Sequence, residues 1–479
     1  MSQSNLHLLD LPNELLFIIL NKFGNVNALY SLLGRINERF DCLLQDNVFT
    51  KTLHLIKISS TYDYISSLDD SILSRFCSDI LPKIHHNVKH LTLESKSMKR
   101  ILLCGNYSNL VSLKVFHFTQ DIAFFYFTDQ SIFRHIFKDQ IIELTLLVDD
   151  DLCRGRSLKD YTVNVYVPIL TFFKRLKHLS ISIPYFYGDY PSLSICNLSS
   201  TMFSSSILTK LSIDVYSFDD CRCLLDGRLK QLTILIVRIY QINYHSSIIH
   251  MIDDNLPHLK CFSLICYEKT DAYDNRVLPL LHRMTYLEKL TLYLRLHGRN
   301  IFVDGTHLHR EILMHMSQLH AFIFYISTEI EINDSIDRLS DNDIQQTFTN
   351  IGYYRIACAV NYYRKSKAIC HIFSLPFIFD RLIKICSHFP AVIYEHVTEL
   401  TILDDILFNY EFIVRIRKAF PSLDDLTIII LQPPSDEFGQ DELRENQSSA
   451  IMKYLHLSGL TTLYRSDDYL RENFTRDTT

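Results

Sequence analysis

The chain has 479 residues, a formal net charge of −6 and a pI near 6.4, so it lacks the basic surplus that is typical of nucleic-acid-binding proteins. With 47% hydrophobic residues it has ample material for a core, which excludes wholesale disorder. Its twelve cysteines form no CxxC pair, which favours buried thiols in a reducing compartment. No apolar run approaches the roughly 18 residues that a membrane span needs. We therefore expect a cytoplasmic or nuclear protein, without a membrane segment.

The first fifty residues have the pattern of short helices. Leu11-Pro12-Asn13-Glu14-Leu15 opens the first helix, because proline suits the first helical turn. The apolar side of this helix recurs at three- and four-residue steps, at Leu15, Ile18, Ile19 and Phe23. Gly24 ends it, and a second helix presents Leu29 and Ile36 on one face. Helices this short bury little surface alone, so a partner or a following domain must cover them.

Residues 8–50 resemble an F-box, the short helical motif that begins Leu-Pro-x-Glu-Leu and docks onto the Skp-type adaptor of cullin ubiquitin ligases. The opening LPNEL is the most specific part, and Phe40 and Phe49 stand at or near positions where the family commonly has tryptophan. The resemblance implies that five residues contribute to the adaptor interface or fix its geometry: Leu11, Pro12, Leu15, Leu29 and Ile36. The alternative is an unrelated helical hairpin that happens to begin LPxEL.

A second pattern is the frame Leu-x-x-Leu-x-Leu, with other apolar residues allowed, which we call the repeat frame. Its eleven copies begin at Val88, Leu110, Ile141, Leu176, Leu208, Leu229, Leu259, Leu287, Leu319, Val397 and Leu423. Helical stretches lie between copies, for example at 67–83, 246–256, 307–316 and 407–420. Strand followed by helix predicts a parallel sheet stacked as a solenoid. The copies resemble leucine-rich repeats, although their spacing is irregular, and the alternative is an ordinary doubly wound α/β domain.

These patterns predict an α/β protein: an N-terminal three-helix F-box followed by an irregular leucine-rich-repeat solenoid with a curved parallel sheet. The expected parts are the F-box at 1–50, a helical linker at 51–87, repeats at 88–330, an inserted hairpin and helix at 331–396, C-terminal repeats at 397–465 and a tail at 466–479. Within the insertion, alternation before and after 364–367 predicts a β-hairpin, and a helix is expected over 378–388. The acidic stretch 432–450 has the composition of an exposed loop.

Motifs for chemistry are missing from the sequence. It contains no GxGxxG, GxxxxGK, HExxH or GxSxG, which removes the common signatures of phosphate cradles, zinc proteases and nucleophile elbows. The histidines His307, His309, His315 and His320 do not have the spacing of a metal site on a regular helix. We therefore expect no catalytic residue, cofactor or metal.

The candidate binding residues instead form a surface. The third, fifth and seventh positions of the repeat frame point away from the core, and nine of the eleven fifth positions carry a hydroxyl group. One interpretation is a hydroxyl ladder favoured by β-propensity alone. The other is a concave binding face for a protein ligand, and the residues we select for it are Lys210, Ser212, Lys289, Thr291 and Tyr293.

Together these features lead to a functional expectation. The resemblance implies a non-catalytic, substrate-recognition subunit of an SCF-type ubiquitin ligase, which binds a Skp-type adaptor and cullin scaffold through the F-box. An unknown protein substrate is expected on the repeats, and neither nucleic acid nor membrane is expected as a partner. The alternative is a leucine-rich-repeat interaction scaffold without a ubiquitin-ligase role, whose N-terminal segment is only a helical cap.

Overall fold

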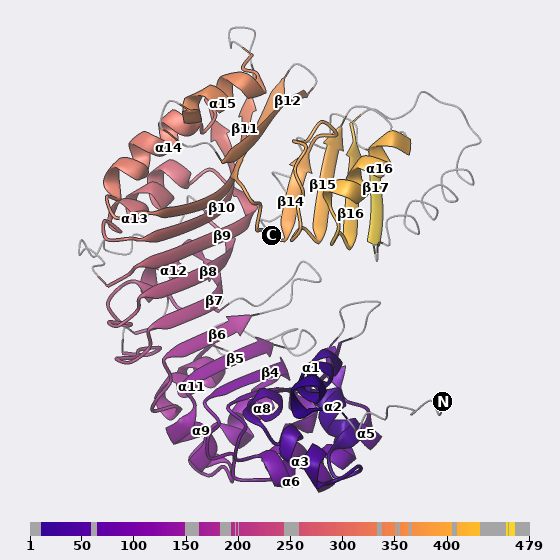
Figure 1. Cartoon of the computed structure of the whole chain (residues 1–479). Coiled ribbons are helices and arrows are strands. Elements are labelled where there is room, and N and C mark those ends of the chain that lie inside the picture. Colours follow the sequence, from indigo (N-terminus) through magenta and orange to yellow (C-terminus); the bar gives the residue numbers. More distant parts are fainter. Residues whose placement is uncertain are drawn as a thin grey trace, which may run out of the picture. The chain divides into compact units, whose positions relative to one another are not determined.

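The structure of the protein is a computed structural model. It describes residues 11–58, 65–148, 162–182, 193–243 without 197 and 200, 258–332, 338–363 without 350, 351, 353 and 354, 366–404, 410–431, 457 and 459–464. The expected helix at 246–256, the acidic stretch 432–450, the hairpin turn at 364–365 and the tail at 466–479 lie outside the described residues. The chain divides into two compact units, Met1–Tyr240 and Gln241–Thr479. Both are mixed α/β, and most strands in each are parallel (Figure 1).

The first unit begins with four short helices, α1 (Asn13–Phe23), α2 (Asn25–Leu32), α3 (Glu38–Leu44) and α4 (Asn47–Thr50). Asn37 caps α3, because its side chain accepts a hydrogen bond from the backbone N–H of Phe40 at 3.0 Å. Gly24 separates α1 from α2 with a φ of 78°, a left-handed value that glycine adopts without strain. The helices expected at the start of the chain are therefore present, and a sharp turn at Gly24 separates the first two.

A parallel sheet follows in the first unit, in the order β8-β7-β6-β5-β4-β3-β1-β2, with only the short β2 antiparallel to its neighbour. The strands are β1 (Thr52–Ile58), β2 (Ile65–Ser67), β3 (His90–Glu94), β4 (Ser112–Phe118), β5 (Glu143–Val148), β6 (His178–Ser182), β7 (Lys210–Ser217) and β8 (Ile234–Gln241). The connecting helices are α5 (Asp70–Arg75), η2 (Phe76–Ile80), α6 (Leu81–Ile84), α7 (Ser95–Leu102), α8 (Gln120–Tyr126), α9 (Arg134–Gln140), η4 (Thr162–Tyr166), α11 (Val167–Phe172) and α12 (Phe218–Leu224). Aromatic rings join successive connections: Phe127 lies 5.2 Å from Phe137 and 5.0 Å from Phe173.

The second unit contains two sheets, in the orders β12-β13-β11-β10-β9 and β14-β15-β16-β17. The strands are β9 (Cys261–Thr270), β10 (Lys289–Arg299), β11 (Ala321–Glu331), β12 (Ile356–Tyr363), β13 (Lys367–Ser374), β14 (Arg381–Ile385), β15 (Glu399–Asp404), β16 (Asp425–Ile430) and β17 (Gly459–Tyr464). The helices are η5 (Tyr273–Val277), α13 (Leu278–His282), α14 (Gly305–Glu311), η6 (Leu313–His315), α15 (Asp341–Thr349) and α16 (Tyr410–Ala419). The predicted hairpin is confirmed by the antiparallel pairing of β12 with β13.

The repeat frame coincides with strands at ten of its eleven expected positions, and each strand begins at the third residue of the frame. The predicted start of the copy at Leu229 is wrong by three residues. The strand begins at Ile234, and the buried residues are Leu232, Leu235 and Val237. Backbone bonds fix this register, because the N–H groups of Thr233 and Ile234 both donate to the carbonyl oxygen of Thr209. The frame therefore begins at Leu232.

Four strands also begin where neither a copy nor the hairpin was expected, at Thr52, Ile65, Arg381 and Gly459. The segment 51–87, expected as a helical linker, contains β1, which pairs in parallel with β3. The helix expected at 378–388 is wrong, because β14 occupies Arg381–Ile385 and pairs in parallel with β15. A bulge at Lys384, whose φ is 59°, lets both Leu382 and Ile385 point into the core. Buried side chains three residues apart are typical of a helix, which is why the sequence pattern predicted one here.

The two sheets of the second unit share one hydrophobic core. Tyr293 and Tyr325 from β10 and β11 pack against the 375–380 segment, with ring distances of 5.2 Å from Tyr293 to Phe379 and 5.8 Å from Tyr325 to Phe377. The same core includes Leu400 of β15 and the buried side of α16. The outward side of β10 and β11 is therefore covered by the second sheet.

Candidate functional site

The N-terminal helices are held in place by hydrogen bonds as well as by their core. The guanidinium group of Arg39 on α3 donates to the carbonyl oxygen of Leu11 at 2.6 Å and to the side-chain oxygen of Asn13 at 2.8 Å. The side-chain amide of Asn25 donates to the carbonyl oxygen of Thr52, which joins α2 to β1. These bonds fix the start of α1 against α3 and fix α2 against the sheet.

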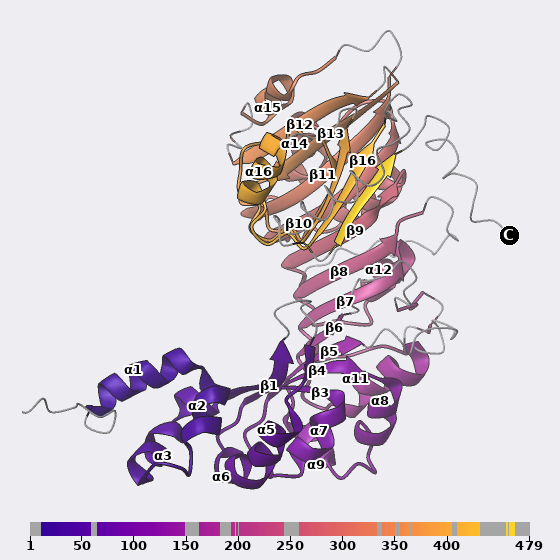
Figure 2. The same ribbon diagram turned by 90° about the vertical axis from the view of Figure 1, so that its right-hand side faces the viewer.

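Large apolar side chains remain exposed on these helices. Leu16 and Leu20 are the buried side of α1, whereas Leu15 and Ile18 on its other side are 47% and 60% exposed. Phe23, the last residue of α1, is 60% exposed. Ile36, in the turn before α3, is 39% exposed. We call Leu15, Ile18, Phe23 and Ile36 the apolar helix surface. In the first unit α1 stands away from the strands of the sheet (Figure 2). Several large apolar side chains exposed within one short helical segment are typical of a surface that a partner covers.

The residues predicted for adaptor binding fall into two groups. Pro12, Leu15 and Ile36 are exposed, and Leu11 is half-buried, so these four are accessible to a partner. Leu29 is fully buried, so it can act only by fixing the geometry of the helices. Periodicity identified an apolar side of α1. It could not show that this side would stay exposed while Leu16 and Leu20 are buried in the core.

The residues predicted for substrate binding in the first unit lie on adjacent strands. Lys210 starts β7 and is exposed, and Ser212, two residues later, is half-buried. Ser212 is in register with Ser180 of β6, which is in register with Thr145 of β5. All three hydroxyl residues are partly exposed, so this part of the ladder is an accessible polar surface.

The predictions for the second unit need a correction. Lys289 is exposed at the start of β10, but Thr291 is 8% exposed and Tyr293 is fully buried. The expectation that these two residues lie on an open face is therefore wrong. The reason is the shared core, in which Tyr293 lies 4.8 Å from Tyr267 and 4.5 Å from Tyr325, ring to ring. A partner cannot contact Tyr293 in this arrangement.

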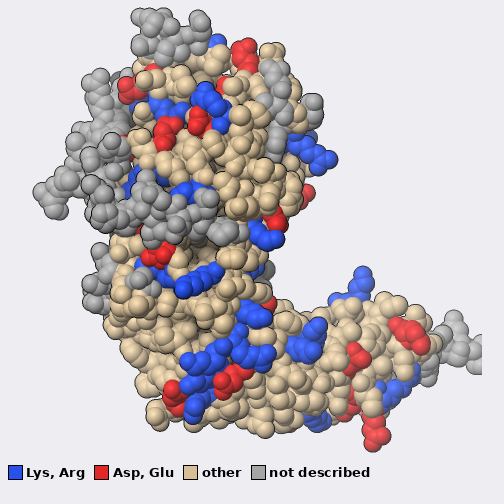
Figure 3. Space-filling view, turned by 90° about the vertical axis from the view of Figure 1, so that its left-hand side faces the viewer, with Lys and Arg blue, Asp and Glu red and all other residues tan. Residues whose placement is uncertain are grey.

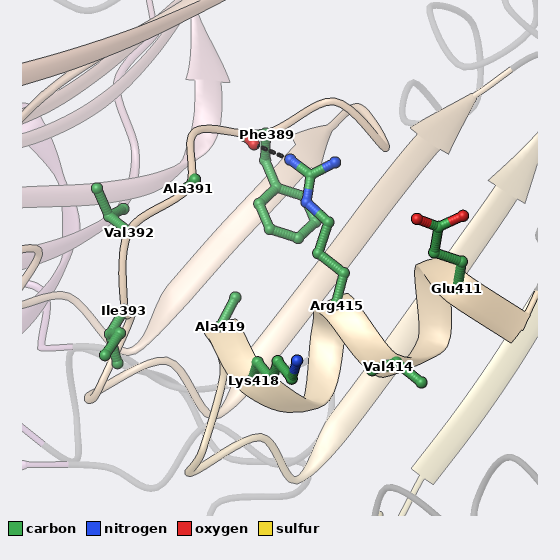
Figure 4. Close-up of a pocket in the computed structure, with 9 residues that line it drawn as sticks. All are labelled: Phe389, Ala391, Val392, Ile393, Glu411, Val414, Arg415, Lys418 and Ala419. Carbon is green, nitrogen blue, oxygen red and sulfur yellow. Dashed lines mark hydrogen bonds between the residues drawn. The ribbon is translucent and has the colours of Figure 1, made fainter.

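A hollow of about 420 Å³ lies beside α16 in the second unit (Figure 4). Its apolar floor includes Phe389, Val392 and Ala419. The guanidinium group of Arg415 donates to the carbonyl oxygen of Phe389 and lies 4.4 Å from the centre of that ring, so it fastens the loop to the helix. The residues that line the hollow include no serine, cysteine or histidine.

The described residues also contain no group of three or more His, Cys, Asp or Glu that could hold a metal ion. Burial raises the pKa of the Cys104, Cys266 and Cys358 thiols to about 12. These thiols remain protonated at neutral pH and are poor nucleophiles.

Within the described part of the chain, no single helix is long and apolar enough to cross a membrane. Counted together, α1 and α2 reach that length and composition, but they are bent by 114° at their break. Comparison with models of known protein families finds no match, and comparison with curated proteins finds no relative.

Proposed function

We propose that the chain is the substrate-recognition subunit of an SCF-type ubiquitin ligase. In this proposal α1 to α3 form an F-box that binds a Skp-type adaptor and, through it, the cullin scaffold. The strand and helix repeats behave as leucine-rich repeats and hold a protein target. The observation that carries the proposal is the apolar helix surface, which follows directly on the LPNEL start of α1.

The energetics of that surface favour a protein partner. Leu15, Ile18 and Phe23 expose about half or more of their side chains to water on one helix. Covering the remainder of each contributes on the order of 1 kcal/mol. A surface that is already ordered by the Arg39 and Asn25 hydrogen bonds loses little conformational entropy when a partner docks.

The role we propose is not catalytic. A subunit that holds a target beside a charged ubiquitin carrier raises the local concentration of the reacting groups, and this proximity is its contribution to the rate. The accessible hydroxyl and lysine positions of β5 to β7 then provide the surface on which the target is held.

The experiment is co-purification of the full chain with a purified Skp-type adaptor. The variant Leu15→Asp with Ile18→Asp places two charges on the apolar helix surface and should abolish co-purification. Because both residues are exposed, the unfolding temperature should stay near that of the parent. The matched control is Leu103→Asp with Phe125→Asp, which changes two side chains that are 61% and 70% exposed elsewhere in the first unit.

A second candidate function is supported by the hydrogen bond from Asn25 to Thr52 and by the stacking of Tyr30 on Phe76, at 6.4 Å. These contacts suit a helical cap that covers the first strands of a scaffold protein without a ligase role. If no Skp-type adaptor binds the parent chain, and removal of residues 1–50 lowers the stability of the rest, the cap is the better account.

A further inference from the structure

A group of cationic side chains lies where three neighbouring strands of the first unit begin. Lys174, Arg175 and Lys177 occupy the turn before β6, Lys210 is the first residue of β7, and Lys230 precedes β8. All five are exposed. We call them the cationic edge. In Figure 3 the molecule is seen from the side on which these strands start, and Lys and Arg side chains gather over the first unit.

Backbone geometry holds the cationic edge together. The N–H groups of Thr209 and Lys210 both donate to the carbonyl oxygen of Lys177, at 2.8 and 3.0 Å. Lys210 is in register with His178, the residue after Lys177. Adjacent strands lie about 4.8 Å apart, so the three strand starts place their charges within roughly 10 Å along the sheet edge.

Three acidic residues near this edge are engaged with other partners. Glu143 accepts a hydrogen bond from His178 at 2.9 Å, and Asp226 is held by Arg228 at 2.7 Å. Asp129 is paired with Lys138 and Arg134. Among the described residues, no ion pair joins Arg175, Lys177, Lys210 or Lys230 to an acidic group, so their positive charge is available to a ligand.

We propose that the cationic edge binds an acidic segment of a protein target. The charges are complementary to carboxylates, and an extended peptide rises about 3.3 Å per residue, so three or four of its residues match the three strand starts. Nucleic acid fits less well. The turns at 174–177, 209–210 and 230–234 contain no aromatic residue on which a base can stack, and the chain as a whole carries a charge of −6.

This inference rests on the proposed function only for the statement that the acidic segment belongs to a ubiquitin-ligase target. Peptide binding at the edge requires no adaptor. Failure of the two proposals is therefore distinguishable: the same variants are measured for peptide binding in the absence of adaptor, and separately for co-purification with the adaptor, which the cationic edge should not affect.

The test measures binding of a fluorescent Glu-Gly repeat peptide to the full chain by anisotropy, at low and at physiological ionic strength. The variant Lys177→Glu with Lys210→Glu should weaken binding at least about tenfold, and added salt should weaken binding to the parent. The matched control is Lys96→Glu with Lys99→Glu on α7. It makes the same change in net charge on two exposed lysines and should weaken binding less than about twofold.

Three results would overturn the inference. Equal weakening by both double variants would assign the effect to net charge alone. No weakening by Lys177→Glu with Lys210→Glu, in a variant that melts like the parent, would exclude the edge. Tighter binding of a labelled single-stranded oligouridylate than of the peptide, lost in the same variant, would make the edge a nucleic-acid site. If the reversal variant does not fold, the neutral variant Lys177→Gln with Lys210→Gln takes its place, with an expected loss of about threefold or more.

Discussion

The first and second units use the same repeat frame but treat the outward side of their strands differently. In the first unit Ser180 and Ser212 lie partly exposed on β6 and β7. In the second unit Tyr293 and Tyr325 occupy seventh positions of the frame on β10 and β11, and both are fully buried beneath the second sheet. One frame therefore supports an accessible polar surface in one unit and a core in the other.

The difference follows from the side chains at the outward positions. The seventh positions at the far end of the first unit carry Ser182, Asp214 and Arg238, and the Arg238 guanidinium donates to Asp214 at 2.7 Å. Asp214 is buried, and its charge is balanced by the partly buried Arg238 rather than by water. Tyr293 and Tyr325 instead offer large aromatic faces, which are stabilised when Phe377 and Phe379 pack on them. On β10 and β11 the aromatic residues at outward positions thus accompany a covering sheet.

The largest loss of stability is expected when an aromatic side chain is removed from the covered face of the second unit. Tyr293→Ala should lower the free energy of unfolding of the second unit by about 3–5 kcal/mol, because it leaves a cavity at the centre of the aromatic cluster. The measurement is chemical denaturation of the full chain. A loss below about 1 kcal/mol would mean that the second sheet does not cover β10.

The next largest loss of stability is expected from substitutions that test the register of β8. Leu235 is fully buried, and Leu235→Ala should cost about 2–5 kcal/mol, whereas Ile234→Ala at a half-buried position should cost clearly less. Denaturation of both variants compares the two possible frames directly. If Ile234→Ala proved the more damaging change, the frame would begin at Leu229 after all.

The covered face should also make the second unit sensitive to acid. Nδ1 of the fully buried His371 accepts a hydrogen bond from the Tyr325 hydroxyl at 2.9 Å, and Nε2 donates to the carbonyl oxygen of Lys384 at 3.1 Å. A neutral ring satisfies both bonds. Burial lowers the pKa of His371 from 6.5 to about 3. Since the folded pKa lies below the unfolded pKa, the stability that the neutral ring contributes is present above pH 6.5 and is lost as the pH falls toward 3.

Between pH 7 and pH 5 this loss should amount to about 2 kcal/mol, measured by urea denaturation at both pH values. Burial raises the pKa of Glu399, so its protonation favours the folded state as the pH falls and opposes this loss. Burial alone would raise the pKa of Glu329, but Lys269 and other nearby lysines lower it to about 2, so its contribution is lost only below pH 4.5.

His371→Asn should reduce the difference between pH 7 and pH 5 by about 2 kcal/mol. Burial also lowers the pKa values of His297 and His307, so these two residues should account for a remaining part of it. An unchanged difference in that variant would show that other groups cause it.

The smallest effect is expected on the accessible face. Ser180→Ala with Ser212→Ala should change the free energy of unfolding by no more than about 0.5 kcal/mol, because both hydroxyl groups are already partly in water. Denaturation under the conditions used for Tyr293→Ala gives the comparison. A cost above about 2 kcal/mol would show that the hydroxyl ladder stabilises the sheet.

Much of the fold could be predicted from periodicity. The frame located ten strands because apolar residues at its first, fourth and sixth positions must be buried whichever sheet they join. It failed at Leu229, where Leu229, Leu232 and Leu235 are spaced so evenly that two registers fit the pattern. It also missed β14, because the bulge at Lys384 gives a strand the spacing of a helix.

The candidate sites were harder to predict. Tyr293 was expected on an open face, because its local pattern cannot show that residues 375–404 and 410–430 return to cover it. The cationic residues of the edge were visible in the sequence, but Lys210 was the only one of them selected as a candidate binding residue. Lys177 and Lys230 become its neighbours through the pairing of strands that lie 20 or more residues apart in the chain.

The central claim is that the apolar helix surface binds a Skp-type adaptor. The most direct measurement is hydrogen–deuterium exchange of the full chain with and without the purified adaptor. We expect slower exchange in α1 and in the turn that carries Ile36, with exchange in β14 to β16 unchanged. Binding that protects only the sheet strands, or no protection at saturating adaptor, would contradict it.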